Sequence, residues 1–317
     1  TILEHYYCRE TSGRIVFEQA MPRGSRGIRR RDLTAALIKA LGEEENLIYA
    51  ELNELEFDSE SRVAAARFKS AAGTIHVKAD VYIGAEGVNS RARQAMYPDW
   101  PTIPDRVPEL VGLVRCDRAV AWAGSALNKF HAPEGGIALG ILPVDAEHVV
   151  WYLQFDSCRH PMSTAVLRGD AAARRSFTES LVGGWAHPIP SLLATTDFGR
   201  VHLWRPVESD LVPRFHRGNL ALVGDAAHPF SPFTSQGVSS AIADAAVLAT
   251  ELEGWKSGDD LEEALERYSR QRRRECAPYL NKGRQLRENF LAPLSESSAL
   301  LPIALKVERR IESSPSP

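Results

Sequence analysis

Apolar and polar residues alternate along this chain in short runs, and a few longer stretches repeat apolar residues at helical spacing. Two β-rich runs, at residues 3–8 and 14–19, flank a turn at residues 10–13 and predict a hairpin. Further strands are predicted at residues 47–57, 62–69, 74–79, 81–84, 110–114, 138–142, 148–155, 201–205 and 220–223. Helical spacing predicts helices at residues 27–41, 171–183, 238–252 and 261–290, the last interrupted at Pro278.

The most informative stretch is residues 218–237. An apolar run at residues 220–223 is closed by Gly224 and Asp225, which predicts a buried strand that ends at a site. A carboxylate there can accept hydrogen bonds from a polyol such as a ribityl chain. A helix that begins at Gly237 presents unpaired N–H groups and a partial positive charge to an anion or an electron-rich carbonyl. Asp225 and Gly237 are therefore expected to hold two parts of one extended cofactor, and the alternative is an ordinary strand and helix joined by a polar loop.

This stretch resembles the second flavin motif of the single-component FAD-dependent aromatic monooxygenases. The matching residues are Gly224, Asp225, His228, Pro229, Pro232, Gln236, Gly237, Ala241, Ile242, Asp244 and Ala245. The family is that of the p-hydroxybenzoate hydroxylase-like enzymes, and its salicylate hydroxylase-like branch is the most similar. The resemblance extends over most of the chain. It implies an α/β flavin-binding domain, incomplete at its N-terminus, with a mainly antiparallel β substrate domain and C-terminal helices.

The resemblance also implies roles for individual residues of the motif. Asp225 is expected to bind the ribityl chain, and Pro232 is expected to lie near the flavin ring. The helix N-terminus at Gln236, Gly237 and Val238 is expected to stabilise negative charge on the reduced ring.

Two further candidate cofactor residues come from other parts of the chain. Arg30, with Leu33, matches an Arg-x-x-Leu element before a helix that lies beside the cofactor, which implies a contact from Arg30 to the ribityl or pyrophosphate region. Without the resemblance, the arginines at residues 29–31 are typical of a solvated basic face. Glu86 stands where the middle motif of the family usually has aspartate. The other residues of that motif are retained as Gly87, Ser90 and Arg93, and Ser90 is also a candidate helix cap.

The same comparison divides the chain into five segments. Residues 1–26 are expected to form a hairpin associated with the substrate domain, residues 27–99 and 213–255 the flavin-binding domain, residues 100–212 the substrate domain, and residues 256–317 C-terminal helices and a tail. The last residues, 311–317, are predicted to be disordered.

One feature of the family is missing from the sequence. The fingerprint Gly-x-Gly-x-x-Gly, whose helix binds the FAD pyrophosphate, does not occur in these 317 residues. Ser235 and Ser239 also replace the usual glycine and asparagine. Three explanations are open: the chain is a fragment, a second chain supplies the missing unit, or the site has been rebuilt for another use.

Composition narrows the possible partners. Hydrophobic residues make up 44% and charged residues 25% of the chain, and the net charge is -3. These values give no reason to expect nucleic acid or membrane partners. The four cysteines show neither metal-ligand spacing nor a disulfide pattern, which favours a cytoplasmic location.

The expected function is that of a flavin-dependent monooxygenase. The resemblance implies that FAD is reduced by NADH or NADPH and reacts with O2 to give a C4a-hydroperoxide, which hydroxylates a small aromatic or polyketide-like substrate. The alternative is a flavin-free relative that acts as a binding or partner protein. A third possibility keeps the flavin but changes the reaction.

Catalytic residues are not identifiable from the sequence. Aromatic residues at strand spacing are candidates for the substrate pocket, but such residues more often belong to the core. These are Phe130, Trp151, Phe155 and Trp204. His131 and His187 are candidate bases, although a lone histidine is more often structural. A metal pair of Asp225 and His228 is disfavoured because no third ligand is evident. The arginines at residues 270–274 are interpreted as a solvated helix face.

Overall fold

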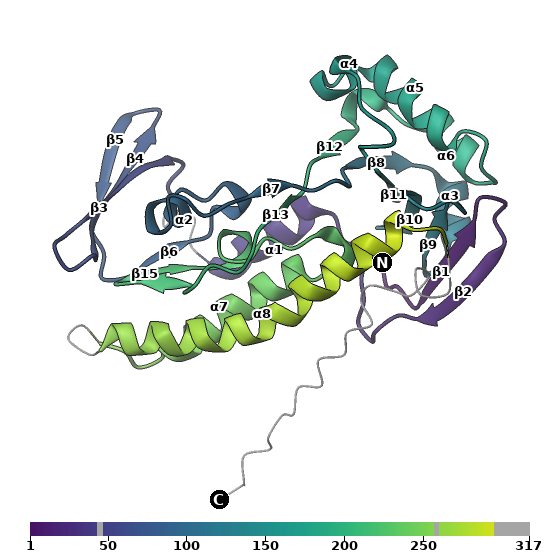
Figure 1. Ribbon diagram of the computed structural model, residues 1–317. Coiled ribbons are helices and arrows are strands. Elements are labelled where there is room, and N and C mark those ends of the chain that lie inside the picture. Colours follow the sequence, from purple (N-terminus) through teal and green to yellow (C-terminus); the bar gives the residue numbers. More distant parts are fainter. Residues whose placement is uncertain (43–46, 257–259, 295–317) are drawn as a thin grey trace, which may run out of the picture.

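The computed structural model describes residues 1–42, 47–256 and 260–294. Two regions of β structure lie at opposite ends of the molecule (Figure 1). Helices α7 (Gly237–Leu252) and α8 (Leu261–Leu291) pack against each other and extend from one region toward the other. The predicted tail at residues 311–317 lies outside the described residues. None of the described helices combines the length and the apolar character needed to cross a membrane.

The larger β region is one seven-stranded sheet, which confirms the predicted hairpin and the predicted antiparallel character. In spatial order its strands are β12 (His202–Trp204), β8 (Glu109–Arg115), β11 (His148–Phe155), β10 (Ile137–Pro143), β9 (Ala126–His131), β1 (His5–Glu10) and β2 (Ile15–Ala20). Every neighbouring pair is antiparallel except β1 and β9, which are parallel. The strand β9 was not predicted, because Asn128 and Lys129 interrupt its apolar pattern.

One face of this sheet is an apolar core. The shorter helices that cover it are α3 (Asp117–Ala123), α4 (Thr164–Arg168), α5 (Ala171–Val182) and α6 (Ile189–Thr195) (Figure 1). Phe130, Trp151 and Phe155 are completely buried in this core, so the interpretation of these aromatic residues as core is confirmed. Trp204, by contrast, is 40% exposed.

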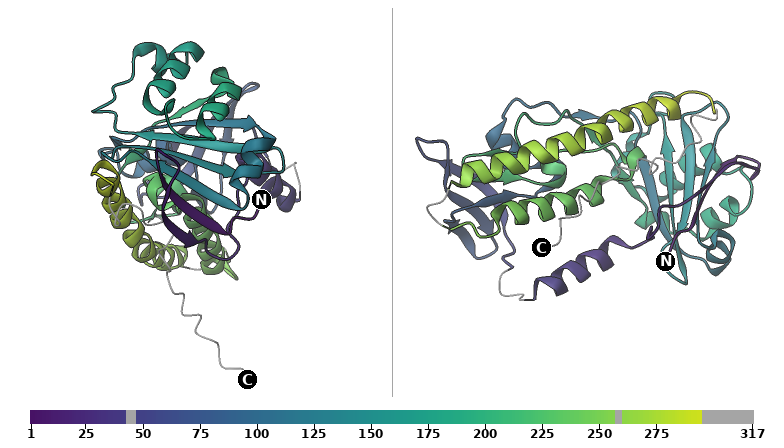
Figure 2. Two further views of the ribbon diagram at one scale, coloured as in Figure 1. Left: turned by 90° about the vertical axis from the view of Figure 1, so that its right-hand side faces the viewer. Right: turned by 90° about the horizontal axis from the view of Figure 1, so that it is seen from below.

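The opposite face of the sheet is turned toward the long helices. Figure 2, in its left view, shows the sheet between the teal helices on one side and the yellow-green helices on the other. Ala138 of β10 packs here with Phe290 and Leu291 of α8. The two faces of the sheet therefore have different surroundings, and the second one meets the segment around residues 232–234.

The smaller β region contains the strand that leads to the flavin-like motif. Here β15 (Leu220–Leu222) pairs antiparallel with β14 (His216–Arg217) and parallel with β6 (Tyr82–Gly84). A separate antiparallel sheet, formed by β3 (Glu51–Phe57), β4 (Val63–Ser70) and β5 (Gly73–Val77), lies beside it. The strand β15 is buried, as predicted, whereas Ile83 of β6 is 53% exposed. The apolar run at residues 81–84 forms a strand as predicted, but no other described strand pairs with the free edge of β6, which leaves Ile83 exposed.

Helix α1 (Arg30–Leu41) forms where it was predicted, but its apolar face is not covered. Leu37 and Leu41 are 56% and 55% exposed, and no residue of the helix is buried. The right view of Figure 2 shows α1 standing apart from the two long helices. The periodicity of apolar residues therefore predicted the position of the helix. The burial of its apolar face depends on which segments pack against it.

The last long helix is continuous, so the predicted interruption at Pro278 is wrong. Proline inside a helix removes one backbone hydrogen bond and costs about 3 kcal/mol. Cys276 and Leu280 are buried on either side of it. The packing of these and the other buried residues of α8 offsets that cost.

Gly112 of β8 provides a test of the core. An added Cβ would lie 2.4 Å from the indole Nε1 of Trp151, which is completely buried and donates a hydrogen bond to Thr196. Gly112→Ala is expected to lower the free energy of unfolding by about 1 to 3 kcal/mol, because the ring has no room to move. Urea denaturation would measure this. Gly184→Ala is the matched control, since a Cβ there meets no atom within 4 Å, and equal stability of the two variants would contradict the packing described.

Candidate cofactor site

Asp225 lies where the buried strand β15 ends. Gly224 adopts a left-handed conformation with φ of 59°, and a Cβ there would lie 3.2 Å from that of Ala241. A glycine is therefore needed for the chain to turn tightly against α7. Partial desolvation raises the pKa of the Asp225 carboxyl above its usual value, although its surface remains open to solvent. The charges of His228, Arg30 and Arg93 act in the opposite direction.

The structure thus brings Arg30 and Asp225 into one neighbourhood. Arg30 is the first residue of α1 and is exposed, and its charge favours the ionised form of Asp225. A carboxylate and a guanidinium that both face solvent at a strand end can bind the hydroxyl and phosphate groups of one extended ligand. Neither side chain is buried in the interior of the fold.

Arg93 joins the loop of Glu86 to the loop of Asp225. Its guanidinium donates hydrogen bonds to the carbonyl oxygens of Asp225 and Ala226, at 3.0 and 3.2 Å, and to that of Val88. Arg93 is only 3% exposed, so these contacts fix the two loops relative to each other. The residue was retained in the middle motif, but its contacts with the second motif could not be deduced from the sequence.

Glu86 is engaged by the helix that follows it, α2 (Arg91–Met96). One of its oxygens accepts from the Ser90 hydroxyl at 2.8 Å and the other from the backbone N–H of Ala92 at 2.9 Å. Ser90 itself accepts from the N–H of Arg93, which confirms it as the helix cap. These bonds use the carboxylate to position α2, and a direct contact from Glu86 to a cofactor stays a prediction.

The predicted ring site lies at the start of α7. The turn η5 (Pro232–Thr234) leads into Ser235, which has a left-handed φ of 52°. This conformation explains why glycine is usual at that position. Gln236 makes no capping hydrogen bond with its side chain, and a Cβ at Gly237 would meet no atom within 4 Å. Val238 is 60% exposed, so the first turn of α7 faces open space.

These features fit the ring and ribityl end of FAD. Asp225 supplies an accessible carboxylate, and Arg30 supplies a cation near it. The N-terminus of α7 is uncapped, and a ligand can approach the backbone of Gly237 closely because no other atom lies near it. Such a helix end attracts an electron-rich carbonyl or a developing negative charge. In the family that the motif resembles, the pyrophosphate of FAD is bound by the glycine-rich fingerprint that the sequence lacks.

A buried ionic network holds the loop after β15 in place. One oxygen of Asp244 accepts from the backbone N–H of Gly224 at 2.7 Å and contacts the Nε2 of His228 at 2.6 Å. The other oxygen accepts from Arg272 at 2.6 Å. Arg272 is 2% exposed, so its interpretation as part of a solvated face is wrong. The hydrogen bonds of the network compensate for its desolvation.

The thiol of Cys276 completes this cluster. The ligand atoms of His228, Asp244 and Cys276 lie within 4.8 Å of one another. The guanidinium of Arg272 is bonded to Asp244 in the same space, so a protein cation already neutralises the carboxylate. Burial favours the neutral imidazole, but the hydrogen bond to Asp244 and the nearby thiol of Cys276 outweigh it and raise the pKa of His228 to about 9. The cluster is therefore an ion network and not an arrangement suited to a metal.

The turn η5 also contacts the large sheet. Phe233 packs with Ala138 of β10 and with Phe290 of α8, the two phenyl ring centroids being 5.2 Å apart. The ammonium of Lys129 lies 5.6 Å from the centre of the Phe233 ring. The candidate base His131 is buried on the same strand as Lys129. Lys129 was not identified as a candidate site residue from the sequence. The one indication that the sequence offers is a charged residue within a short β-strand.

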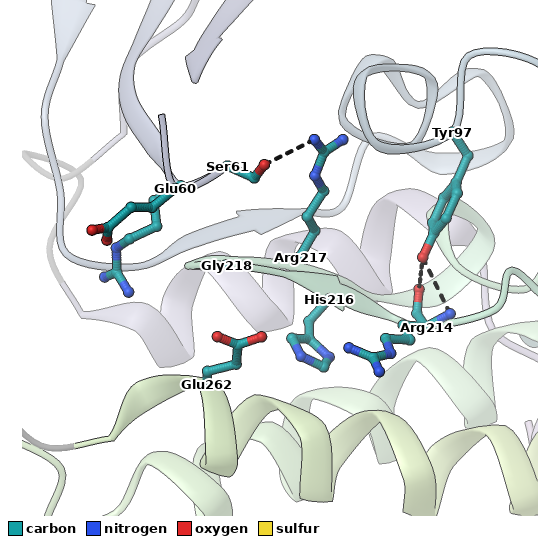
Figure 3. Close-up of a pocket in the computed structure, with 9 residues that line it drawn as sticks. Glu60, Ser61, Tyr97, Arg214, His216, Arg217, Gly218 and Glu262 are labelled. Atoms are coloured by element: carbon teal, nitrogen blue, oxygen red, sulfur yellow. Dashed lines mark hydrogen bonds between the residues drawn. The ribbon is translucent and has the colours of Figure 1, made fainter. Parts of the chain in front are cut away.

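A surface cavity lies elsewhere, at the opposite end of β15. It has a volume of about 280 Å³ and lies between the turn at Ser61, the strand β14 and the start of α8 (Figure 3). Figure 3 shows Arg217 pointing toward Ser61, and His216 pointing toward α8 near Glu262. This cavity is at the amino end of β15, whereas Asp225 follows its carboxyl end. Ligands of open α/β sheets bind at the carboxyl ends of the strands, so this cavity is not the cofactor site.

The raised pKa of His228 predicts a pH-dependent stability. Because the folded pKa is about 9 and the unfolded value about 6.5, the contribution is complete below pH 6.5 and is lost as the pH rises through 9. We expect the wild-type protein to lose on the order of 3 kcal/mol in this window, and His228→Gln to lack this loss. Urea denaturation from pH 6 to pH 10 measures both. His76→Gln, on exposed β5, is the control, and parallel pH profiles for all three proteins would contradict the assignment.

The chain is similar in sequence to several monooxygenases. A 6-hydroxynicotinate 3-monooxygenase of Pseudomonas fluorescens is 31% identical over 188 residues, which are 54% of this chain and 44% of that protein. A 3-amino-4-hydroxybenzoate 2-monooxygenase of Streptomyces platensis is 29% identical over 201 residues, which are 60% of this chain and 46% of that protein. The chain thus spans about half the length of the curated relatives it matches.

Solved structures agree with the fold. HpxO of Klebsiella pneumoniae, in complex with FAD and uric acid, has a TM-score of 0.76 and 23% identity over 89% of this chain and 71% of that one. The 2,6-dihydroxypyridine-3-hydroxylase of Arthrobacter nicotinovorans has a TM-score of 0.75 and 15% identity over 92% and 77% of the two chains. The family described as FAD binding domain matches residues 4–280. The chain therefore belongs to this FAD-binding family, the p-hydroxybenzoate hydroxylase-like flavoproteins that the motif at residues 224–245 resembles.

Proposed function

We propose that the protein is a FAD-dependent monooxygenase that hydroxylates a small aromatic molecule with O2 and NADH or NADPH. The observation that carries this proposal is the pairing of an exposed Asp225 with the charge of Arg30, together with the uncapped start of α7 at Gly237 further along the same loop. Relatives whose names state aromatic hydroxylation give further support.

The residues of this chain have separate roles in the proposed reaction. When bound, FAD supplies the electrons taken from the nicotinamide and the activation of O2. Asp225 accepts hydrogen bonds from the ribityl hydroxyl groups. The first amide groups of α7, at Gly237 and Val238, stabilise negative charge at the carbonyl edge of the ring. Arg30 neutralises an anionic part of the cofactor, and Pro232 with Phe233 excludes water from the ring.

The division of the chain follows from these roles. We propose that residues 27–99 and 213–255 form the flavin-binding part and that residues 100–212, with the hairpin at 1–26, form the substrate part. A cytoplasmic location agrees with the free thiols of Cys8, Cys116, Cys158 and Cys276. No contact among the described residues favours the flavin-free alternative, and a second chain that completes the site stays a prediction.

The role of Asp225 can be tested by its replacement with asparagine. Loss of charge-assisted hydrogen bonds worth about 1.5 to 3 kcal/mol is expected to weaken FAD binding about tenfold to a hundredfold. Quenching of flavin fluorescence during titration of the purified protein measures the affinity. Asp99→Asn, at an exposed position near α2, is the matched control and should bind FAD as the wild type does.

The reaction itself needs a separate measurement. Oxidation of NADH or NADPH in the presence of O2 and an aromatic substrate should yield a product heavier by one oxygen atom. A wild-type protein that does not retain FAD after gel filtration would contradict the proposal. If the protein retains FAD but transfers no oxygen to the substrate, it catalyses a different flavin-dependent reaction.

A further inference from the structure

The cavity at the amino end of β15 is lined by three arginines. Arg62 lies directly before β4, Arg214 lies shortly before β14, and Arg217 is the last residue of β14. Two carboxylates, those of Glu60 and Glu262, line the same space. The lining therefore carries a net positive charge when all five side chains are ionised. Guanidinium groups bind phosphate through two parallel hydrogen bonds, so this lining favours an oxyanion as the ligand.

Two sets of hydrogen bonds hold the backbone of these arginines in place. The carboxylate of Asp58 accepts from the backbone N–H groups of Glu60 and Arg62, each at 2.9 Å. On the other side of the cavity, the Tyr97 hydroxyl donates to the carbonyl oxygen of Arg214 at 3.1 Å and accepts from its N–H at 3.2 Å. The backbone around the cavity is thus fixed before a ligand arrives, which lowers the entropic cost of binding.

The guanidinium groups keep most of their hydrogen-bonding capacity. Within the described part of the chain, the side chain of Arg62 takes part in no hydrogen bond or ion pair. Arg217 donates one hydrogen bond, to the Ser61 hydroxyl at 3.2 Å, and its guanidinium lies 5.2 Å from the centre of the Phe57 ring. A guanidinium has five N–H donors, so both arginines have donors available for a ligand.

His216 adds a buried polar atom that lacks a partner. Its side chain lines the cavity and the residue is only 2% exposed. Figure 3 shows the ring between the side chains of Glu262 and Arg214. The Nε2 atom lies 3.9 Å from an oxygen of Glu266, which is too far for a hydrogen bond, and among the described residues Nδ1 has no partner either. Buried polar groups are almost always hydrogen-bonded, so this imidazole indicates a ligand that supplies the missing bond.

We propose that this cavity is a second ligand site, which binds the phosphate group of a small hydroxyl-bearing ester. The guanidinium groups of Arg62, Arg214 and Arg217 hold the phosphate oxygens, and His216 donates a further hydrogen bond from Nδ1. The volume of about 280 Å³ is close to the lower limit of pockets that hold small organic ligands. Burial lowers the pKa of His216, so the ring is neutral near pH 7 and has one N–H to donate.

The two carboxylates of the lining indicate the rest of the ligand. Glu60 and Glu262 are exposed and repel a bare phosphate. An ionised carboxylate only accepts hydrogen bonds, so each is satisfied by a hydroxyl group on the remainder of the ligand. Guanidinium groups for the phosphate and carboxylates for the hydroxyl groups together fit a phosphorylated sugar or a similar polyol.

This site is separate from the candidate cofactor site. It lies at the amino end of β15, whereas Asp225 follows the carboxyl end of the same strand. Neither Asp225, Arg30 nor the start of α7 is among the residues that line the cavity. The inference therefore goes beyond the proposed function, and binding of the ester is expected both with and without FAD.

Isothermal titration calorimetry of the purified protein with ribose 5-phosphate, inorganic phosphate and ribose tests the site. We expect ribose 5-phosphate to bind more tightly than inorganic phosphate, and ribose to bind least. Arg62→Met is expected to weaken binding of ribose 5-phosphate about tenfold to a hundredfold, because it removes charge-assisted hydrogen bonds. Arg200→Met is the matched control, at an exposed position of η3 (Phe198–Arg200), and should bind as the wild type does.

Two substitutions of His216 test the buried nitrogen. The side-chain amide of asparagine places its nitrogen near the position of Nδ1, whereas that of glutamine reaches the position of Nε2. We expect His216→Asn to retain most of the affinity for ribose 5-phosphate and His216→Gln to lose about tenfold. Urea denaturation compares the stability of the two variants, and equal affinities in equally stable variants would contradict the donation from Nδ1.

The remaining outcomes decide between sources of the phosphate and between sites. Inorganic phosphate that binds as tightly as ribose 5-phosphate would identify free phosphate as the ligand of the same site. No binding of either compound at millimolar concentration would overturn the inference. Loss of binding in Arg30→Met together with full binding in Arg62→Met would place the phosphate at the cofactor site and would also overturn it. Failure to retain FAD, by contrast, contradicts the proposed function and leaves this site standing.

Discussion

The arrangement of the candidate site depends on one buried carboxylate. Asp244 of α7 binds the backbone of Gly224, the ring of His228 and the guanidinium of Arg272, so that it joins the loop after β15 to both long helices. Loss of one partner of such a buried pair costs about 3 to 5 kcal/mol, because the other charge stays buried without compensation. The position of Asp225 and the start of α7 relative to each other is fixed by this network.

A second constraint connects that loop to the large sheet. Helix α8 begins beside β15, where Leu265 and Tyr268 are buried, and it ends beside β10, where Leu286 and Phe290 are buried. One rigid element thus contributes to both regions, and η5 lies where they meet. The ring of Phe233 is consequently in contact with the sheet and adjacent to the helix N-terminus at the same time.

The sequence was informative where the signal is local. The positions of β15, Asp225 and α7 were predicted from an apolar run, a glycine, two prolines and helical spacing. These signals are all local, so no information about distant contacts was needed. Arg272 was wrongly assigned to a solvated helix face because its partner Asp244 is 28 residues away in the sequence. The sequence of an arginine run does not show which of its members binds a distant carboxylate. Helix α1 and strand β6 were located correctly, but burial depends on neighbours that periodicity does not specify. Lys129 was missed since its strand has no regular alternation.

The two faces of the large sheet show why the second one belongs to a site. The face under α5 and α6 is completed by apolar side chains such as Leu139 and Trp151, which need no further partner. The face toward η5 keeps His131 and Gln154 buried with atoms that have no hydrogen bond among the described residues. A protein core tolerates this only where another molecule can satisfy those atoms. These side chains are buried, so the local dielectric constant is low, and the partial positive charge at the start of α7 acts more strongly on whatever binds beside it.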